Sequence, residues 1–121
     1  MAKIAHTGIV VRDMEAALHF YTNVLGFVHA GGLKLPDVEL AFLKGENQSL
    51  ELLAFPGDTA EKPQGVISHL ALEVEDLQKE LARLKEHGIV LDPADIREPE
   101  GMKVIFFAGP SGEQIELVEY V

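Results

Sequence analysis

One segment of the sequence occurs twice. Residues 4–14 read IAHTGIVVRDM and residues 67–77 read ISHLALEVEDL, and the two align without a gap at a constant offset of 63 positions. His6 aligns with His69, and Asp13 aligns with Asp76. A repeat of this kind indicates two copies of one supersecondary unit, which constrains the fold more than any single motif does.

The end of each half repeats as well. Residues 49–55 read SLELLAF and residues 114–120 read QIELVEY, so that Glu51 aligns with Glu116 at an offset of 65. Each copy therefore carries one histidine near its beginning and one glutamate near its end.

The hydrophobic pattern predicts a mixed α+β fold with the order β-α-β-β-β in each half. Asp13 and Asp76 are suited to cap helices that end before Gly26 and Gly88. Alternating apolar residues and turn signals predict strands. The expected strands are residues 3–11, 27–35, 38–43, 49–55, 67–74, 102–108 and 114–120, with weaker signals at 89–91 and 95–97.

The 121 residues are expected to form a single domain of two modules. Module 1 spans about residues 1–55 and module 2 about residues 67–121, and a linker rich in proline, glycine and charge covers about 56–66. A half of about 55 residues is marginal alone, so the modules are expected to pack within one chain or to pair across a dimer.

Composition excludes several classes of function. Ten basic and twenty acidic residues give a net charge of −10, which disfavours nucleic acid and anionic membrane surfaces as partners. The absence of cysteine excludes a disulfide framework and a thiol nucleophile. Without a signal-like segment or an apolar run long enough to span a bilayer, a cytoplasmic location is expected.

The repeated polar residues are candidates for one metal site. Within their strands, the two histidines and the two glutamates lie opposite the apolar face. If that apolar face packs on the helix, all four polar side chains point to the other, concave face of the sheet. Two imidazoles and two carboxylates suit a divalent metal and leave coordination positions open for water or substrate. The candidates are His6, Glu51, His69 and Glu116.

Each of these residues also has an ordinary structural interpretation. A single histidine in a strand is more often at the surface or in a core hydrogen bond, and a glutamate that alternates with leucine usually faces solvent. The occurrence of both residue types at equivalent places in two copies favours the metal site. His19, His29 and His87 have no counterpart in the repeat and are expected at the surface.

The chain resembles the vicinal oxygen chelate superfamily, which includes glyoxalase I, methylmalonyl-CoA epimerase, extradiol dioxygenases, fosfomycin-modifying thiol transferases and bleomycin-binding proteins. The resemblance rests on HTGIVVRDMEAALHFYTNVLGF at 6–27, LEL at 50–52, ISHLALEVEDL at 67–77 and GPSGEQIEL at 109–117. It implies two tandem βαβββ modules that form a cup-shaped mixed sheet around a metal, with the helices on the outer face, often in a homodimer.

The resemblance is greatest to glyoxalase I, and it implies the same four metal ligands. One divalent ion (nickel, cobalt, zinc, manganese or iron) and no other cofactor is expected. The implied activity is that of a metal-dependent lyase or isomerase that acts on a small molecule. Glu116 or Glu51 would move a proton between carbons next to a carbonyl.

Two positions depart from the glyoxalase I pattern. The residues that hold the glutathione carboxylates in that enzyme correspond to Val10 and Phe55 here, both apolar. With the acidic net charge, this favours a smaller or more hydrophobic substrate. Phe42, Phe55 and Phe106 form either an apolar pocket wall or ordinary core.

Two other functions of the same superfamily remain open. One is a metal-dependent dioxygenase or thiol transferase, for which Glu51 is an additional carboxylate beside two histidines and one glutamate. The other is a metal-free binding protein of the bleomycin-resistance type.

Overall fold

The computed structural model describes residues 1, 3–62, 65 and 67–121 and contains two compact units. The first unit consists of residues up to Lys62 together with the turn Pro110–Gly112, and the second contains the remaining residues. The expected linker, about 56–66, includes residues 63, 64 and 66, which lie outside the described residues. Within it, Lys62 Nζ lies 2.5 Å from Asp58 Oδ2, and this hydrogen bond holds the pKa of the Asp58 carboxyl below its usual value.

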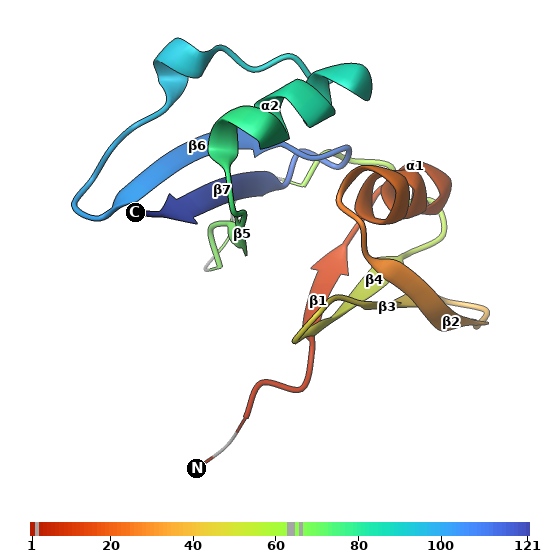
Figure 1. The fold of residues 1–121 in the computed structure, drawn as a ribbon. Coiled ribbons are helices and arrows are strands. Elements are labelled where there is room, and N and C mark those ends of the chain that lie inside the picture. The colour runs from red at the N-terminus through yellow and green to blue at the C-terminus, as the bar shows by residue number, and fades with distance from the viewer. Residues whose placement is uncertain (2, 63–64, 66) are drawn as a thin grey trace. The chain divides into compact units, whose positions relative to one another are not determined.

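The first unit contains a four-stranded sheet in the order β1-β4-β3-β2 (Figure 1). Its strands are β1 (Thr7–Val10), β2 (Val28–Lys34), β3 (Glu39–Lys44) and β4 (Ser49–Ala54). β1 runs parallel to β4, and the other neighbours are antiparallel. Strand β2 is irregular, with a shift of register between His29 and Gly31.

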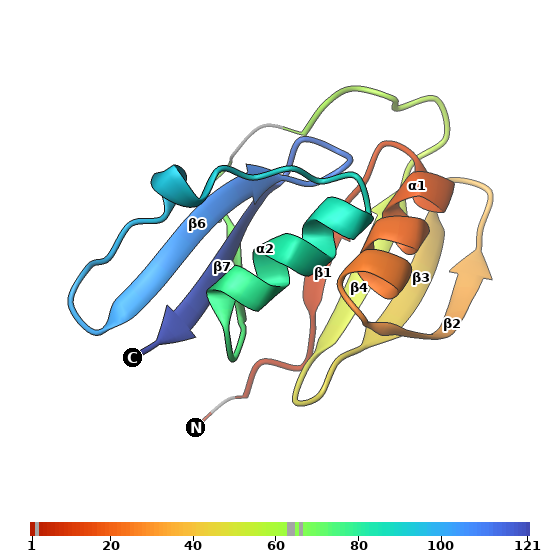
Figure 2. The ribbon, with the colours of Figure 1, turned by 45° about the horizontal axis from the view of Figure 1, so that its top comes forward.

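Helix α1 (Met14–His19) begins at the predicted cap, where Asp13 accepts a hydrogen bond from the Ala16 backbone N–H at 3.1 Å. It continues as a π-helical segment, η1 (Phe20–Val24), and the chain leaves this segment at Gly26, whose φ of 87° favours glycine. Figure 2 shows α1 lying across its sheet. This side of the sheet carries the buried residues Ala41, Leu43, Leu50 and Leu52.

The second unit contains a three-stranded sheet in the order β5-β7-β6. Its strands are β5 (Leu70–Glu73), β6 (Met102–Ala108) and β7 (Gln114–Tyr120). Helix α2 (Leu77–Glu86) begins at Asp76, which accepts a hydrogen bond from the Lys79 backbone N–H at 3.1 Å. The helix lies across this sheet, with its buried residues Leu77, Leu81 and Leu84 (Figure 2).

The strands weakly predicted between α2 and β6, at residues 89–91 and 95–97, are not formed. Residues 89–91 are irregular, and Asp95 ends a 3-10 turn, η2 (Pro93–Asp95). Only Arg97 pairs with the sheet, through a single bridge to Val104. Pro93 and Pro99 cannot donate a backbone hydrogen bond, which prevents a continuous ladder along this segment.

The predicted fold class is confirmed, because the chain is a mixed α+β protein with two small sheets and few helices. In the described part of the chain, no helix is both long enough and apolar enough to cross a membrane.

The repeated caps give a first prediction. Replacement of Asp76 by alanine should lower the free energy of unfolding by about 1 kcal/mol, because the Lys79 N–H loses its acceptor at the start of α2. Urea denaturation followed by circular dichroism measures the change. Glu75→Ala, at the exposed neighbouring position, is the control and should change stability by less than about 0.5 kcal/mol. Equal effects of the two substitutions would contradict the assignment of the cap.

Candidate functional site

The two candidate carboxylates occupy the same place in their sheets. In the first unit β1 pairs with β4 so that Gly8 lies opposite Glu51, and in the second unit β5 pairs with β7 so that Ala71 lies opposite Glu116. The repeat in the sequence is therefore also a repeat in strand register. Both glutamates alternate with buried aliphatic residues, as the pattern predicts.

The two candidate histidines were expected inside strands 3–11 and 67–74, but each lies one residue before the observed strand. β1 begins at Thr7 and β5 begins at Leu70, so His6 and His69 immediately precede them. The partner strands explain this difference. The register places His6 level with Ser49 and His69 level with Gln114, which are the first residues of β4 and β7. The histidines therefore stand at the end of each parallel ladder, and the residues before them have no partner strand to join.

Each histidine reaches the glutamate of its own unit. His6 Nε2 lies 3.2 Å from Glu51 Oε2, and His69 Nε2 lies 3.4 Å from Glu116 Oε1. The imidazole side chains are 52% and 37% exposed, whereas the carboxylate side chains are only 19% and 16% exposed. Each unit thus presents an accessible nitrogen beside a largely covered carboxylate.

An aromatic ring accompanies each carboxylate. Phe42 lies opposite Glu51 on β3, and Phe106 lies opposite Glu116 on β6. The Phe106 ring packs edge-on against His69, with 5.5 Å between ring centroids and an interplanar angle of 84°. Phe106 and Phe55 are 39% and 42% exposed, so neither is ordinary core. The equivalence of Phe42 and Phe106 is visible in the sequence as an offset of 64.

Two further contacts near these residues were not predicted. Ser68 Oγ lies 2.6 Å from His69 Nδ1, which leaves Nε2 of that ring toward Glu116. Arg12 follows β1, and its Nε donates to the Pro110 carbonyl at 3.1 Å while its backbone N–H donates to Ser111 Oγ at 3.0 Å. The Arg12 guanidinium is therefore bound to the turn Pro110–Gly112.

The other histidines are exposed, as predicted: His19, His29 and His87. Among the described residues, no three histidine, cysteine, aspartate or glutamate side chains form one group that could hold a metal ion. The arrangement observed in the structure is a histidine–carboxylate pair, which occurs once in each module.

Residues 3–117 match the family model of the Glyoxalase/Bleomycin resistance protein/Dioxygenase superfamily. The chain belongs to this superfamily. It is 34% identical over 97 residues to an ethylmalonyl-CoA/methylmalonyl-CoA epimerase of Cereibacter sphaeroides, covering 73% of this chain and 72% of that protein. It is 30% identical over 127 residues to a probable lactoylglutathione lyase of Synechocystis, covering 96% of this chain and 94% of that protein.

The fold of the superfamily is also found by comparison of structures. A glyoxalase family protein from Enterococcus faecalis superimposes with a TM-score of 0.84 at 31% sequence identity, covering 97% of each chain. The resemblance seen in the sequence is thereby confirmed at the level of the superfamily and its fold.

The pairing within each unit gives a second prediction. Glu51→Gln should shift the ring nitrogen resonances of His6, because the carboxylate beside Nε2 is lost, and should leave those of His29 unchanged. Glu116→Gln should shift the resonances of His69 in the same way. Two-dimensional ¹H–¹⁵N spectra of the imidazole side chains measure both effects. Unchanged resonances of His6 and His69 in these variants would show that the pairs do not form in solution.

Proposed function

We propose that this protein is a glyoxalase I-like, metal-dependent lyase or isomerase that moves a proton next to a carbonyl of a small substrate. The observation that carries the proposal is the histidine–carboxylate pair at the same register in both modules. A solvated sheet face has no need for such a duplication. The relatives of this protein include an epimerase and a probable lyase, which agrees with a reaction of this general class.

The donor set fits a divalent ion. His6, Glu51, His69 and Glu116 would hold it, and mixed imidazole and carboxylate donors suit nickel, cobalt, zinc, manganese or iron. Both imidazoles are exposed enough to be reached by an ion. When bound, the ion would polarise the substrate carbonyl and make the neighbouring C–H more acidic.

The protein's own side chains would move the proton. Glu116 or Glu51 would accept it from the carbon beside the carbonyl and return it to the neighbouring carbon, which leaves the substrate isomerised and the carboxylate unchanged. Phe42 and Phe106 lie opposite these carboxylates and place an apolar ring beside each of them. A carboxylate that is mostly covered but lies beside an accessible imidazole is suited to this role.

The proposed substrate is small and need not carry glutathione. The positions that would correspond to the carboxylate-binding residues of glyoxalase I are Val10 and Phe55, and both are partly exposed apolar side chains. Arg12, the nearest cation in sequence to Val10, is occupied by its contacts with Pro110 and Ser111. A cytoplasmic homodimer is part of the same proposal.

The catalytic role gives a third prediction. Glu116→Gln and His69→Ala should each slow turnover at least about 100-fold without unfolding the protein, because each removes a donor or proton acceptor at a partly exposed site. Exchange of the C–H proton with solvent deuterium, followed by NMR over a panel of small carbonyl compounds, measures turnover. His87→Ala, at the exposed end of α2, is the matched control and should retain full activity. Full activity of either site variant would remove the assigned site.

Metal removal gives a fourth prediction. Dialysis against a chelator should abolish the exchange activity, and addition of one of the five candidate metals should restore it. Elemental analysis and calorimetric titration of the dialysed protein measure the binding. Oxygen uptake with bound iron, or thiol transfer with bound manganese, would select another enzyme of the superfamily. No affinity for any of these metals would favour a metal-free binding protein.

A further inference from the structure

Lys44 lies on the same face of the first sheet as Glu51. On β3, Phe42 is directly opposite Glu51, and Lys44 is two residues further along the strand, opposite Ser49. Side chains two apart on a strand point to the same face of a sheet. We name this face, which carries Glu51, Phe42 and Lys44, the carboxylate face.

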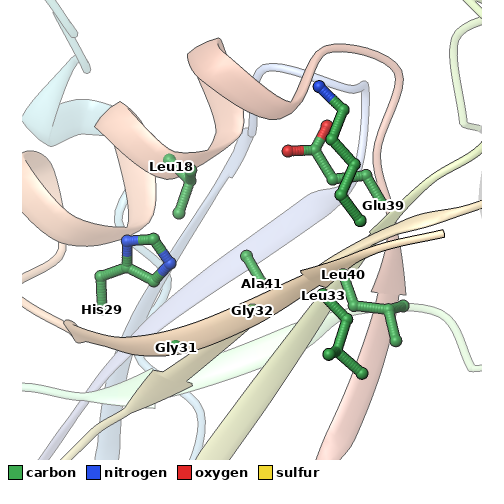
Figure 3. Close-up of a pocket in the computed structure, with 9 residues that line it drawn as sticks. Leu18, His29, Gly31, Gly32, Leu33, Glu39, Leu40 and Ala41 are labelled. Atoms are coloured by element: carbon green, nitrogen blue, oxygen red, sulfur yellow. The ribbon is translucent and has the colours of Figure 1, made fainter.

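Lys44 is the only lysine or arginine that strands β1 to β4 place on the carboxylate face. Their one other basic residue, Lys34, lies opposite Glu39 at the edge and therefore on the α1 side. Figure 3 shows this division: Glu39, Ala41 and His29 point toward α1, around a cavity of about 330 Å³, whereas Leu33 and Leu40 point away from it. Lys44 is exposed, and it forms no ion pair with any of the described residues.

The surroundings of Lys44 on this face are apolar. Leu40 lies opposite Leu53 and Leu33, and Val28 lies opposite Lys44 itself. Val28 and Leu33 are more than half exposed. A ligand bound on this face would contact a largely hydrocarbon surface. The ammonium group of Lys44 lies near the end of that surface, and the carboxylate of Glu51 lies near its middle.

Lys44 is not part of the duplication. The pairing of Lys44 with Ser49 corresponds to the pairing of Ala108 with Gln114 in the second sheet. Because the second module forms with alanine at this place, the module does not need a lysine there to fold. A role of Lys44 in ligand recognition is therefore compatible with the folding of the first module.

We infer that Lys44 binds a single carboxylate of the substrate, whose apolar body lies over the carboxylate face of the first sheet. The substrate class is a small carbonyl compound with one carboxylate and a hydrocarbon chain. With a net charge of −10, the protein repels polyanions, and one unpaired ammonium group offsets one negative charge. The role of this ligand as a substrate rests on the proposed function. Its recognition by Lys44 does not depend on that function.

The test compares 2-oxohexanoate with its methyl ester, which has the same apolar chain and ketone but no charge. Binding is measured by ¹H–¹⁵N NMR titration of the full-length protein, with chelator present and again after metal addition. The native protein should bind the acid about tenfold more tightly than the ester, a difference of about 1.4 kcal/mol. Lys44→Ala should abolish this preference, and Lys44→Arg should retain it.

Lys34→Ala is the matched control, since it removes the same charge from the opposite face of the same sheet. It should keep the tenfold preference. A preference that persists in Lys44→Ala, or that is lost equally in Lys34→Ala, would overturn the inference, as would failure of the native protein to bind either compound. A preference that depends on Lys44 without any metal-dependent proton exchange would support this inference and contradict the proposed function.

Discussion

The parallel pairing of the first and last strands of each module is the constraint on which the candidate site depends. It sets Gly8 beside Glu51 and Ala71 beside Glu116, and it brings the histidine before each first strand to its carboxylate. A slip of one residue would turn the glutamate to the helix side. The buried leucines and isoleucine that flank the glutamates on the helix side oppose that slip, because burying a carboxylate there is costly.

Each module contains one histidine–carboxylate pair, but the strands and residues around the two pairs differ. The first sheet has a fourth strand, β2, whereas the second has a single bridge at Arg97 in the corresponding segment. Lys44 and Ala108 occupy equivalent places on β3 and β6. The duplicated positions are the ones proposed for metal and proton chemistry, and positions that differ between the modules, such as Lys44 and Ala108, are the ones at which ligand specificity can vary. This division agrees with a superfamily whose members act on different ligands.

Much of this fold follows from local pattern. β6 and β7 have the bounds expected from their alternation, and both helices begin at the expected aspartates, because alternation and capping are properties of short segments. The start of β1 was misjudged because it depends on where β4 begins. The π-helical segment η1 was not expected, since hydrophobic spacing does not distinguish its hydrogen-bond pattern from that of an α-helix. The repeat identified the four candidate residues, but it did not predict that each histidine lies beside the glutamate of its own unit, because strand register alone gives no distance between side-chain atoms.

The central claim of the proposal is that two histidine–carboxylate pairs, one of each kind of module, hold a single metal ion. X-ray absorption spectroscopy of the protein loaded with nickel or cobalt, together with elemental analysis, tests it most directly. The account predicts one metal per chain, with scattering from two imidazoles and with nitrogen and oxygen donors at about 2.0–2.2 Å. Two ions per chain with one imidazole each, or a metal without imidazole ligands, would contradict it.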